Sequence, residues 1–383
     1  MDGFLQLFEG VTALTWQHFL MYLIGGGLIY LAVKKDYEPM LLLPIGFGAI
    51  LVNLPLSVVW EHGSQEGILK ILYNFGIITE LFPVLIFIAV GAMIDFTPLL
   101  QNPRMVFFGA AAQFGIFMTT ILALFVNSIF PELGFNLEVA ASIGIIGAAD
   151  GPTSIYVASQ FAREWLGPIT VAAYSYMALV PVIQPPVIRF MTTKKERKMR
   201  MPYQQKKISR EVLILFPIFI TIIAGIIAPI SVPLVGLLMF GNLIRESQVL
   251  ERLSHSAQNE LANLVTLLLG ITIGATMKFE AFLTIQTLII ILMGLLAFVF
   301  DTAGGVLFAK IVNLFTKDKI NPMIGAAGIS AFPMSARVIQ KMATKEDPHN
   351  FILMHAVSAN VAGQLGSIIA GGMVLALVPW LLG

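Results

Sequence analysis

The feature that most constrains this chain is a series of long runs without charged residues. Runs free of Asp, Glu, Lys and Arg cover residues 10–33, 39–60, 105–131, 165–188 and 281–300. A helix that crosses a hydrocarbon core of about 30 Å needs roughly 20 apolar residues, so each run suffices for one crossing. The sequence therefore predicts an all-α polytopic membrane protein.

Two further uncharged runs, 212–244 and 351–383, are too long for one straight crossing each. Pro217, Pro229 and Pro233 are expected to break the first run, and several glycines are expected to loosen the second. Counting these as broken or paired segments predicts about ten to twelve crossings.

Composition excludes several classes of function. Only 12% of the residues are charged, against about 25% in soluble domains, and the net charge of +1 gives no basis for binding nucleic acid. The chain has no cysteine, which excludes disulfides and thiolate chemistry. Its five histidines show no HxxxH spacing, so neither a zinc nor a haem site is predicted.

The strongly polar segment of the chain is residues 194–210, KKERKMRMPYQQKKISR. The positive-inside rule places this basic loop in the cytoplasm. It mainly serves to orient the chain, and a docking surface for a partner or a lipid headgroup is the alternative. The loop separates two predicted membrane halves, 1–193 and 211–383.

Each half contains an interrupted motif before its last long apolar segment: GAADGPTSIYV at 147–157 and GISAFPMSARV at 328–338. Aligning Pro152 with Pro333 also matches a glycine, a serine and a valine between the motifs. Paired segments interrupted by Gly and Pro indicate the substrate site of a transporter built from repeats. The sequence thus predicts two internal repeats with broken or re-entrant helices.

In the first motif, Pro152 disfavours a continuous helix, so the backbone near Asp150 is expected to unwind and leave carbonyls free. Together with the hydroxyls of Thr153 and Ser154, these groups form an all-oxygen site suited to a hard cation. One carboxylate favours a monovalent ion such as Na⁺. The alternative is that Asp150 only caps a half-helix.

The second motif carries Ser330 and the positively charged Arg337, which suits an anionic substrate or a pair with Asp150. The alternative for Arg337 is a topogenic role. Asn321 is expected to cap this segment, while Asn360 is an amide inside an apolar run, where it bonds across helices or ligates an ion. Asp301, like Glu80 and Asp95, stands near the end of an apolar run and is predicted at an interface.

Three stretches, GAADGPTSIY, NPMIGAAGISAFPMSARV and FILMHAVSANVAGQLGS, resemble the membrane-embedded β subunit of the biotin-dependent sodium-translocating decarboxylases. That family includes the oxaloacetate, methylmalonyl-CoA and glutaconyl-CoA decarboxylases. The resemblance covers nearly the whole chain and is strongest after residue 136. It implies inverted repeats of an elevator-type transporter in the bacterial cytoplasmic (inner) membrane.

The resemblance also implies partners: a carboxyltransferase (α) subunit, a biotin carrier protein or domain and a small membrane (γ/δ) subunit, with a homo-oligomer as a further option. Carboxybiotin on the carrier is decarboxylated at the β subunit, which consumes a proton and drives Na⁺ outward.

Residue roles follow from the same resemblance. The metal ligands it implies for Na⁺ are Asp150, Ser330, Asn321 and Asn360, to which the oxygen site of the first motif adds Thr153, and Asp150 also couples Na⁺ to H⁺. Arg337, with Ser330, is matched to carboxybiotin binding. Tyr176 is matched to the functional tyrosine, although Tyr174 is close by, and Arg337, Tyr176 and Asp150 form the catalytic set.

The ion site and the repeat alone fit a plain Na⁺-coupled carboxylate carrier or a Na⁺/H⁺ exchanger equally well. The resemblance favours the decarboxylase subunit. A mere structural membrane anchor would need neither Asp150 nor Arg337. The acyl substrate cannot be chosen from this chain, because its recognition would belong to a partner.

Overall fold

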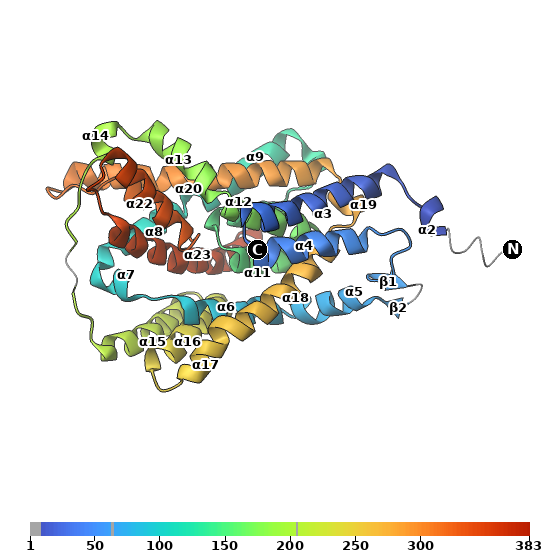
Figure 1. The fold of residues 1–383 in the computed structure, drawn as a ribbon, viewed down its shortest axis with the longest axis horizontal. Coiled ribbons are helices and arrows are strands. Elements are labelled where there is room, and N and C mark those ends of the chain that lie inside the picture. The colour runs from blue at the N-terminus through green and yellow to red at the C-terminus, as the bar shows by residue number, and fades with distance from the viewer. Residues whose placement is uncertain (1–8, 63–64, 204–205) are drawn as a thin grey trace.

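The computed structural model describes residues 9–62, 65–203 and 206–383, and it is almost entirely helical (Figure 1). The elements of the first half are α2 (Glu9–Thr12), α3 (Trp16–Lys35), α4 (Pro39–Val52), β1 (Glu61–His62), β2 (Gln65–Glu66), α5 (Ile68–Tyr73), η1 (Asn74–Ile78), α6 (Leu81–Met93), α7 (Thr97–Gln101), η2 (Pro103–Met105), α8 (Val106–Ala112), α9 (Phe114–Ile129), η3 (Pro131–Leu133), α10 (Leu137–Gly144), η4 (Ile145–Ala148), α11 (Gly151–Phe161), η5 (Arg163–Trp165), α12 (Leu166–Ala178) and α13 (Val180–Met191). Strands β1 and β2 form a short antiparallel hairpin with Glu61 opposite Glu66.

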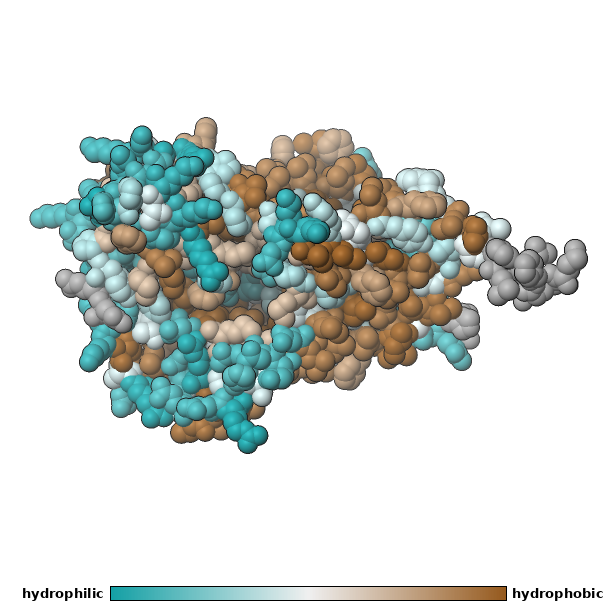
Figure 2. Space-filling view, viewed as in Figure 1, coloured by the Kyte–Doolittle hydropathy of each residue, from teal (hydrophilic) through white to brown (hydrophobic). Residues whose placement is uncertain are grey.

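The remaining elements are α14 (Lys194–Arg197), α15 (Arg210–Ile227), η6 (Pro229–Ser231), α16 (Val232–Ser247), α17 (Glu251–Ser256), η7 (Ala257–Leu261), α18 (Ala262–Ala275), α19 (Phe279–Phe282), α20 (Ile285–Phe315), α21 (Met323–Ala326), α22 (Met334–Glu346) and α23 (Leu353–Leu382). In Figure 1, α3, α4, α20 and α23 run nearly along the long axis of the molecule. Figure 2 shows polar residues gathered at the end that holds α14 and α22, with apolar surface over α3, α4 and α18.

The prediction of a helical membrane protein is confirmed. Among the described residues, six helices are long and apolar enough to span a membrane, and two bent pairs raise the number to eight. The bends are 60° between η1 and α6 and 68° between α12 and α13. The lower end of the predicted ten to twelve crossings is reached only if two shorter apolar segments, Pro39–Val52 and Leu137–Ala148, are also counted.

The two overlong runs behave differently. The first is broken before Pro229, where Ala228 leaves the helical region, although Pro217 lies inside the continuous helix α15. The second forms one helix of 30 residues, α23, so the expected loosening by glycine is wrong. Gly363 in α23 instead lets the carbonyl of Gly328 approach, since a Cβ on Gly363 would clash with it. Small residues in membrane helices commonly serve such close packing.

The order of elements is similar in the two halves. Each has two helices (α3 and α4; α15 and α16) and then a helix interrupted by a π-helical turn (η1; η7). A long segment (α8–α9; α20), a broken segment (α10–α11; α21–α22) and a final apolar segment (α12–α13; α23) follow. This order favours the predicted internal repeat.

The halves also pack reciprocally, with α4 against α18 and α6 against α16. Glycines make both crossings tight. A Cβ on Gly48 or Gly274 would clash with a carbonyl of the facing helix, and the same holds for Gly91 and Gly241. These two crossings join the halves, and α11 of the first broken segment packs against α6.

Candidate ion site

The first broken segment turns at two residues. Ala149 adopts the left-handed conformation with φ 53°, which costs an alanine about 1 kcal/mol, and Asp150 is extended with φ −133°. Pro152 then stands in the first turn of α11, where its missing N–H does no harm. The helix break predicted from Pro152 thus lies at Ala149 and Asp150.

Asp150 precedes α11 as a cap residue would, but its side chain makes no capping hydrogen bond. Its Oδ2 instead accepts hydrogen bonds from Thr153 Oγ1 at 2.7 Å and Ser367 Oγ at 3.0 Å. The residue is 7% exposed. The carboxylate is therefore held by hydroxyl groups, not by the end of a helix, so the structure does not support capping as its only role.

Ser367 connects Asp150 to the second broken segment. The Oγ of Ser330 lies 2.6 Å from Ser367 Oγ and 2.8 Å from the carbonyl oxygen of Gly363. Gln364 Nε2 donates to the Ser330 carbonyl. Residues far apart in the sequence thus form one buried hydrogen-bond network across α11, the second break and α23.

A cavity of about 280 Å³ opens beside this network. The surface is hollowed near the middle of the face in Figure 2. The polar residues that line the cavity come from both halves of the chain: Glu38, Asp150 and Tyr174 from the first, and Asn263, Thr266, Ser330 and Gln364 from the second. No Lys, Arg or His is among the described residues of the lining, so the cavity is suited to a cation rather than an anion.

The structure brings several of the residues predicted from the sequence to this region. Asp150 and Ser330 line the cavity, and Thr153 bonds to the carboxylate of Asp150. Asn360 is fully buried in α23 and donates from Nδ2 to the Ile329 carbonyl at 2.6 Å. Its Oδ1 has no hydrogen-bond partner among the described residues, as expected of an oxygen free to bind a cation.

Other predicted residues lie apart from the cavity lining. Asn321 donates from Nδ2 to the carbonyls of Arg197 and Met199, so it holds the basic loop against the start of α21. Arg337 is exposed on α22 and does not line the cavity. Tyr176 packs against Phe298, with the ring centroids 6.0 Å apart.

Sequence reasoning missed several residues of the site. Ser367 and Gln364 follow Asn360 at spacings of seven and four, so one helical face presents all three. That spacing was the signal available in the sequence. Tyr174, rather than Tyr176, lines the cavity, and its ring faces Gly151 so closely that a Cβ there would clash.

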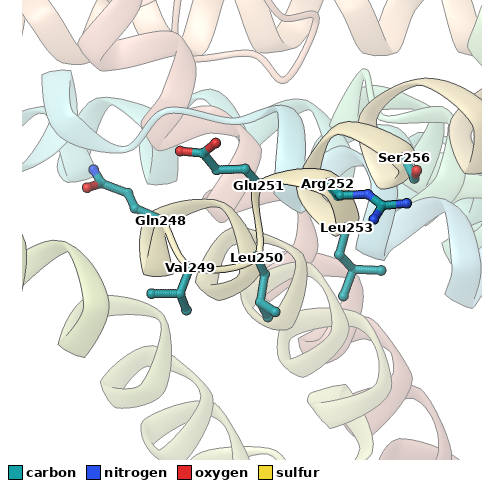
Figure 3. A pocket seen from close by; sticks show the side chains of 7 residues that line it. All are labelled: Gln248, Val249, Leu250, Glu251, Arg252, Leu253 and Ser256. Atoms are coloured by element: carbon teal, nitrogen blue, oxygen red, sulfur yellow. The ribbon is translucent and has the colours of Figure 1, made fainter.

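A separate open depression of about 770 Å³ lies at the turn between α16 and α17 (Figure 3). Its side chains point in different directions, with Gln248 and Glu251 on one side and Val249 and Leu250 on the other. It contains none of the predicted site residues. The cavity beside Asp150 is therefore the candidate site.

Comparison with known proteins agrees with the resemblance in the motifs. Residues 17–378 match the family described as the Na⁺-transporting oxaloacetate decarboxylase beta subunit. The chain belongs to this family. It is thus related to the membrane subunits of sodium-pumping decarboxylases, and the cavity beside Asp150 lies in a β-subunit fold.

Individual β subunits are similar over almost their full length. The glutaconyl-CoA decarboxylase subunit beta of Acidaminococcus fermentans is 49% identical over 97% of this chain and 96% of its own. The methylmalonyl-CoA decarboxylase subunit beta of Veillonella parvula is 48% identical over 97% and 95%. The oxaloacetate decarboxylase beta chain 2 of Salmonella typhi is 45% identical over 94% of each chain. These relatives differ in the acid named, so the likeness does not choose a substrate.

Proposed function

We propose that this chain is the subunit in which decarboxylation of carboxybiotin is coupled to Na⁺ export across the bacterial cytoplasmic membrane. The observation that carries the proposal is the buried network Asp150–Ser367–Ser330, which joins both broken segments beside a cavity without basic residues. Family membership supports the sodium-pumping role. A carboxyltransferase (α) subunit, a biotin carrier and a small membrane subunit complete the complex.

The chemistry divides between two places. Carboxybiotin on the carrier supplies an N–CO₂⁻ bond, which breaks to release CO₂ when the ureido nitrogen takes up a proton. Arg337, exposed on α22 at the polar end, would hold the anionic carboxyl group. Tyr176, or a proton relayed from Asp150, would supply the donor.

Na⁺, as the transported ion, would bind at the carboxylate of Asp150 and the hydroxyl of Ser330, which line the cavity. The hydroxyl of Thr153, bonded to Asp150, and the free Oδ1 of Asn360 would complete the site. The carboxylate of Asp150 carries a single negative charge, so it can bind Na⁺ or H⁺ but not both. Protonation of Asp150 would therefore release Na⁺, which couples the consumed proton to transport. Asn321 would contribute indirectly, since it does not line the cavity and its Oδ1 already accepts the N–H of Met323.

The test uses the whole complex in inside-out vesicles. We expect Asp150→Asn to abolish both Na⁺ uptake and Na⁺-dependent decarboxylation, because the exchangeable charge is lost. Asp318→Asn, at an exposed position, is the matched control and should behave like wild type. Na⁺-stimulated turnover in Asp150→Asn would contradict the proposal. Na⁺ transport without a biotinylated partner would favour a plain secondary transporter.

A further inference from the structure

A second buried acid lies apart from the cavity. Asp301 was expected at an interface, but it stands in the middle of α20, which spans Ile285–Phe315, and it is 0% exposed. The prediction is wrong because α20 continues for more than three turns beyond Asp301, up to Phe315. The proposed coupling at Asp150 makes no use of this residue.

The carboxyl group of Asp301 lies between two glycines. A Cβ on Gly115, in the first turn of α9, would clash with Oδ1, and a Cβ on Gly147, in η4, would lie 2.9 Å from Oδ2. Neither oxygen has a hydrogen-bond partner among the described residues. The neighbouring hydroxyl of Thr302 is likewise buried without a partner. The backbone N–H of Gly115 lies near the carboxyl group, but it forms no hydrogen bond of ordinary geometry with it.

No cation among the described residues forms an ion pair with Asp301. Arg189, on α13, which packs against α20, is exposed near the end of its helix. The α8–α9 segment carries no charge between Arg104 and Glu132, and α10 contributes only Glu138 in its first turn. On α20 itself, Lys310 lies more than two turns away and pairs with Glu196 at 3.2 Å.

Other titratable groups near Asp301 do not compensate its charge either. Tyr176 on α12 packs against Gly294 and Phe298 of α20, and Asp150 follows Gly147 by three residues. An isolated buried carboxylate costs several kcal/mol. The group must therefore be protonated or accompanied by a bound cation.

The surroundings favour a proton over Na⁺. A hard cation needs several oxygen ligands at once, whereas the carboxyl group of Asp301 faces the backbones of Gly115 and Gly147. Asp301 does not line the Asp150 cavity, where such ligands gather. A proton needs only one oxygen. We propose that Asp301 is a proton-binding site of this protein, separate from the cation cavity at Asp150.

The first test is chemical modification of the purified complex with dicyclohexylcarbodiimide, an apolar reagent that reacts with protonated carboxyl groups. Peptide mapping by mass spectrometry would follow Asp301 at several pH values, with and without Na⁺. We expect modification of Asp301 to decrease as the pH rises and to be unaffected by Na⁺. Protection of Asp301 by Na⁺ would overturn the proposal and indicate a metal site.

Infrared spectroscopy gives a second measurement that needs no reagent access. We expect the C=O stretching band of protonated carboxylic acids to lose one component in Asp301→Asn, and to keep that component in Asp150→Asn and Asp318→Asn. An unchanged band in Asp301→Asn would overturn the proposal even if the carbodiimide failed to reach the site. Neither result depends on the proposed decarboxylase activity, whose failure would be seen separately in Asp150→Asn.

Discussion

The two broken segments occupy corresponding places in their halves but carry different chemistry. With Pro152 aligned to Pro333, the position of Asp150 corresponds to Ala331, which is fully buried. The first segment supplies a carboxylate, whereas the second supplies neutral oxygens such as that of Ser330. A repeated scaffold can thus hold a single exchangeable charge, because only one of its two equivalent positions is acidic. Two acids facing the same small space would repel each other.

The largest expected effect comes from making the two segments alike. Ala331→Asp would bury a second carboxylate without a partner and should destabilise the protein by roughly 3–5 kcal/mol. Denaturant-induced unfolding in detergent would measure the change. Ala331→Asn is the control of equal size and should cost clearly less. Equal losses in both variants would show that volume, not charge, sets the limit at this position.

The neighbouring tyrosines separate binding from chemistry. We expect Tyr174→Phe to raise the Na⁺ concentration for half-maximal activity several-fold, because Tyr174 lines the cavity. Tyr176→Phe should instead lower kcat at saturating Na⁺ by about 100-fold, the usual loss on removing a general acid. Steady-state kinetics of the complex distinguish the two. A fall in kcat caused only by Tyr174→Phe would transfer the proton-donor role to Tyr174.

A smaller effect is expected from substituting Ser367, whose hydroxyl bridges the two broken segments. Ser367→Ala removes the hydrogen bond to Asp150 and the contact with Ser330, so Na⁺ affinity should fall roughly tenfold, equivalent to about 1.4 kcal/mol. Ser159→Ala is a matched control, since among the described residues this buried hydroxyl bonds only to the Tyr156 carbonyl of its own helix. Isothermal titration with Na⁺ would compare them. Equal Na⁺ affinities in the two variants would show that the Ser367 hydroxyl does not contribute to Na⁺ binding.

The smallest effect concerns the basic loop at the polar end. Arg197 donates to Glu346 at 2.8 Å, and this hydrogen bond lowers the pKa of the Glu346 carboxyl below its ordinary value of 4.5. A lowered pKa stabilises the folded state above pH 4.5, and the contribution is lost as the pH falls through the lower folded value.

Glu346→Gln should therefore make the loop more accessible to limited proteolysis at pH 7. In wild type the rate of cleavage should rise as the pH falls, and in Glu346→Gln this rise should be absent. Glu251→Gln, at an exposed position in α17, is the control. If Glu346→Gln and wild type were cleaved equally at pH 7, the ion pair would not hold the loop.

The class of fold and the centre of the site could be predicted from the sequence for definite physical reasons. Uncharged runs follow from the cost of charge in hydrocarbon, and Pro152 restricts its own backbone and that of its neighbour. The break at Asp150 is thus a local property. Ser330 was indicated by its place in the matching second motif.

The other parts of the site depend on contacts that a local pattern does not encode. Ser367 bonds to a residue 217 positions away. Glu38, just before α4, and Thr266, in α18, reach the cavity from different halves of the chain. Asp301 looked interfacial because the uncharged run ends there, although the helix does not. The match of Asn321 to Na⁺ stays a prediction, and its Nδ2 contacts with carbonyls of the basic loop could not be read from the sequence.

The glycines at the two reciprocal crossings, Gly48 with Gly274 and Gly91 with Gly241, have a genetic consequence. At each of them a single added methyl group would clash with the backbone of a helix from the other half of the chain. Alanine exchanges there should yield temperature-sensitive strains although no reacting group is altered. A random screen for such strains would identify the helix crossings that join the two halves, without any assay of decarboxylation or transport.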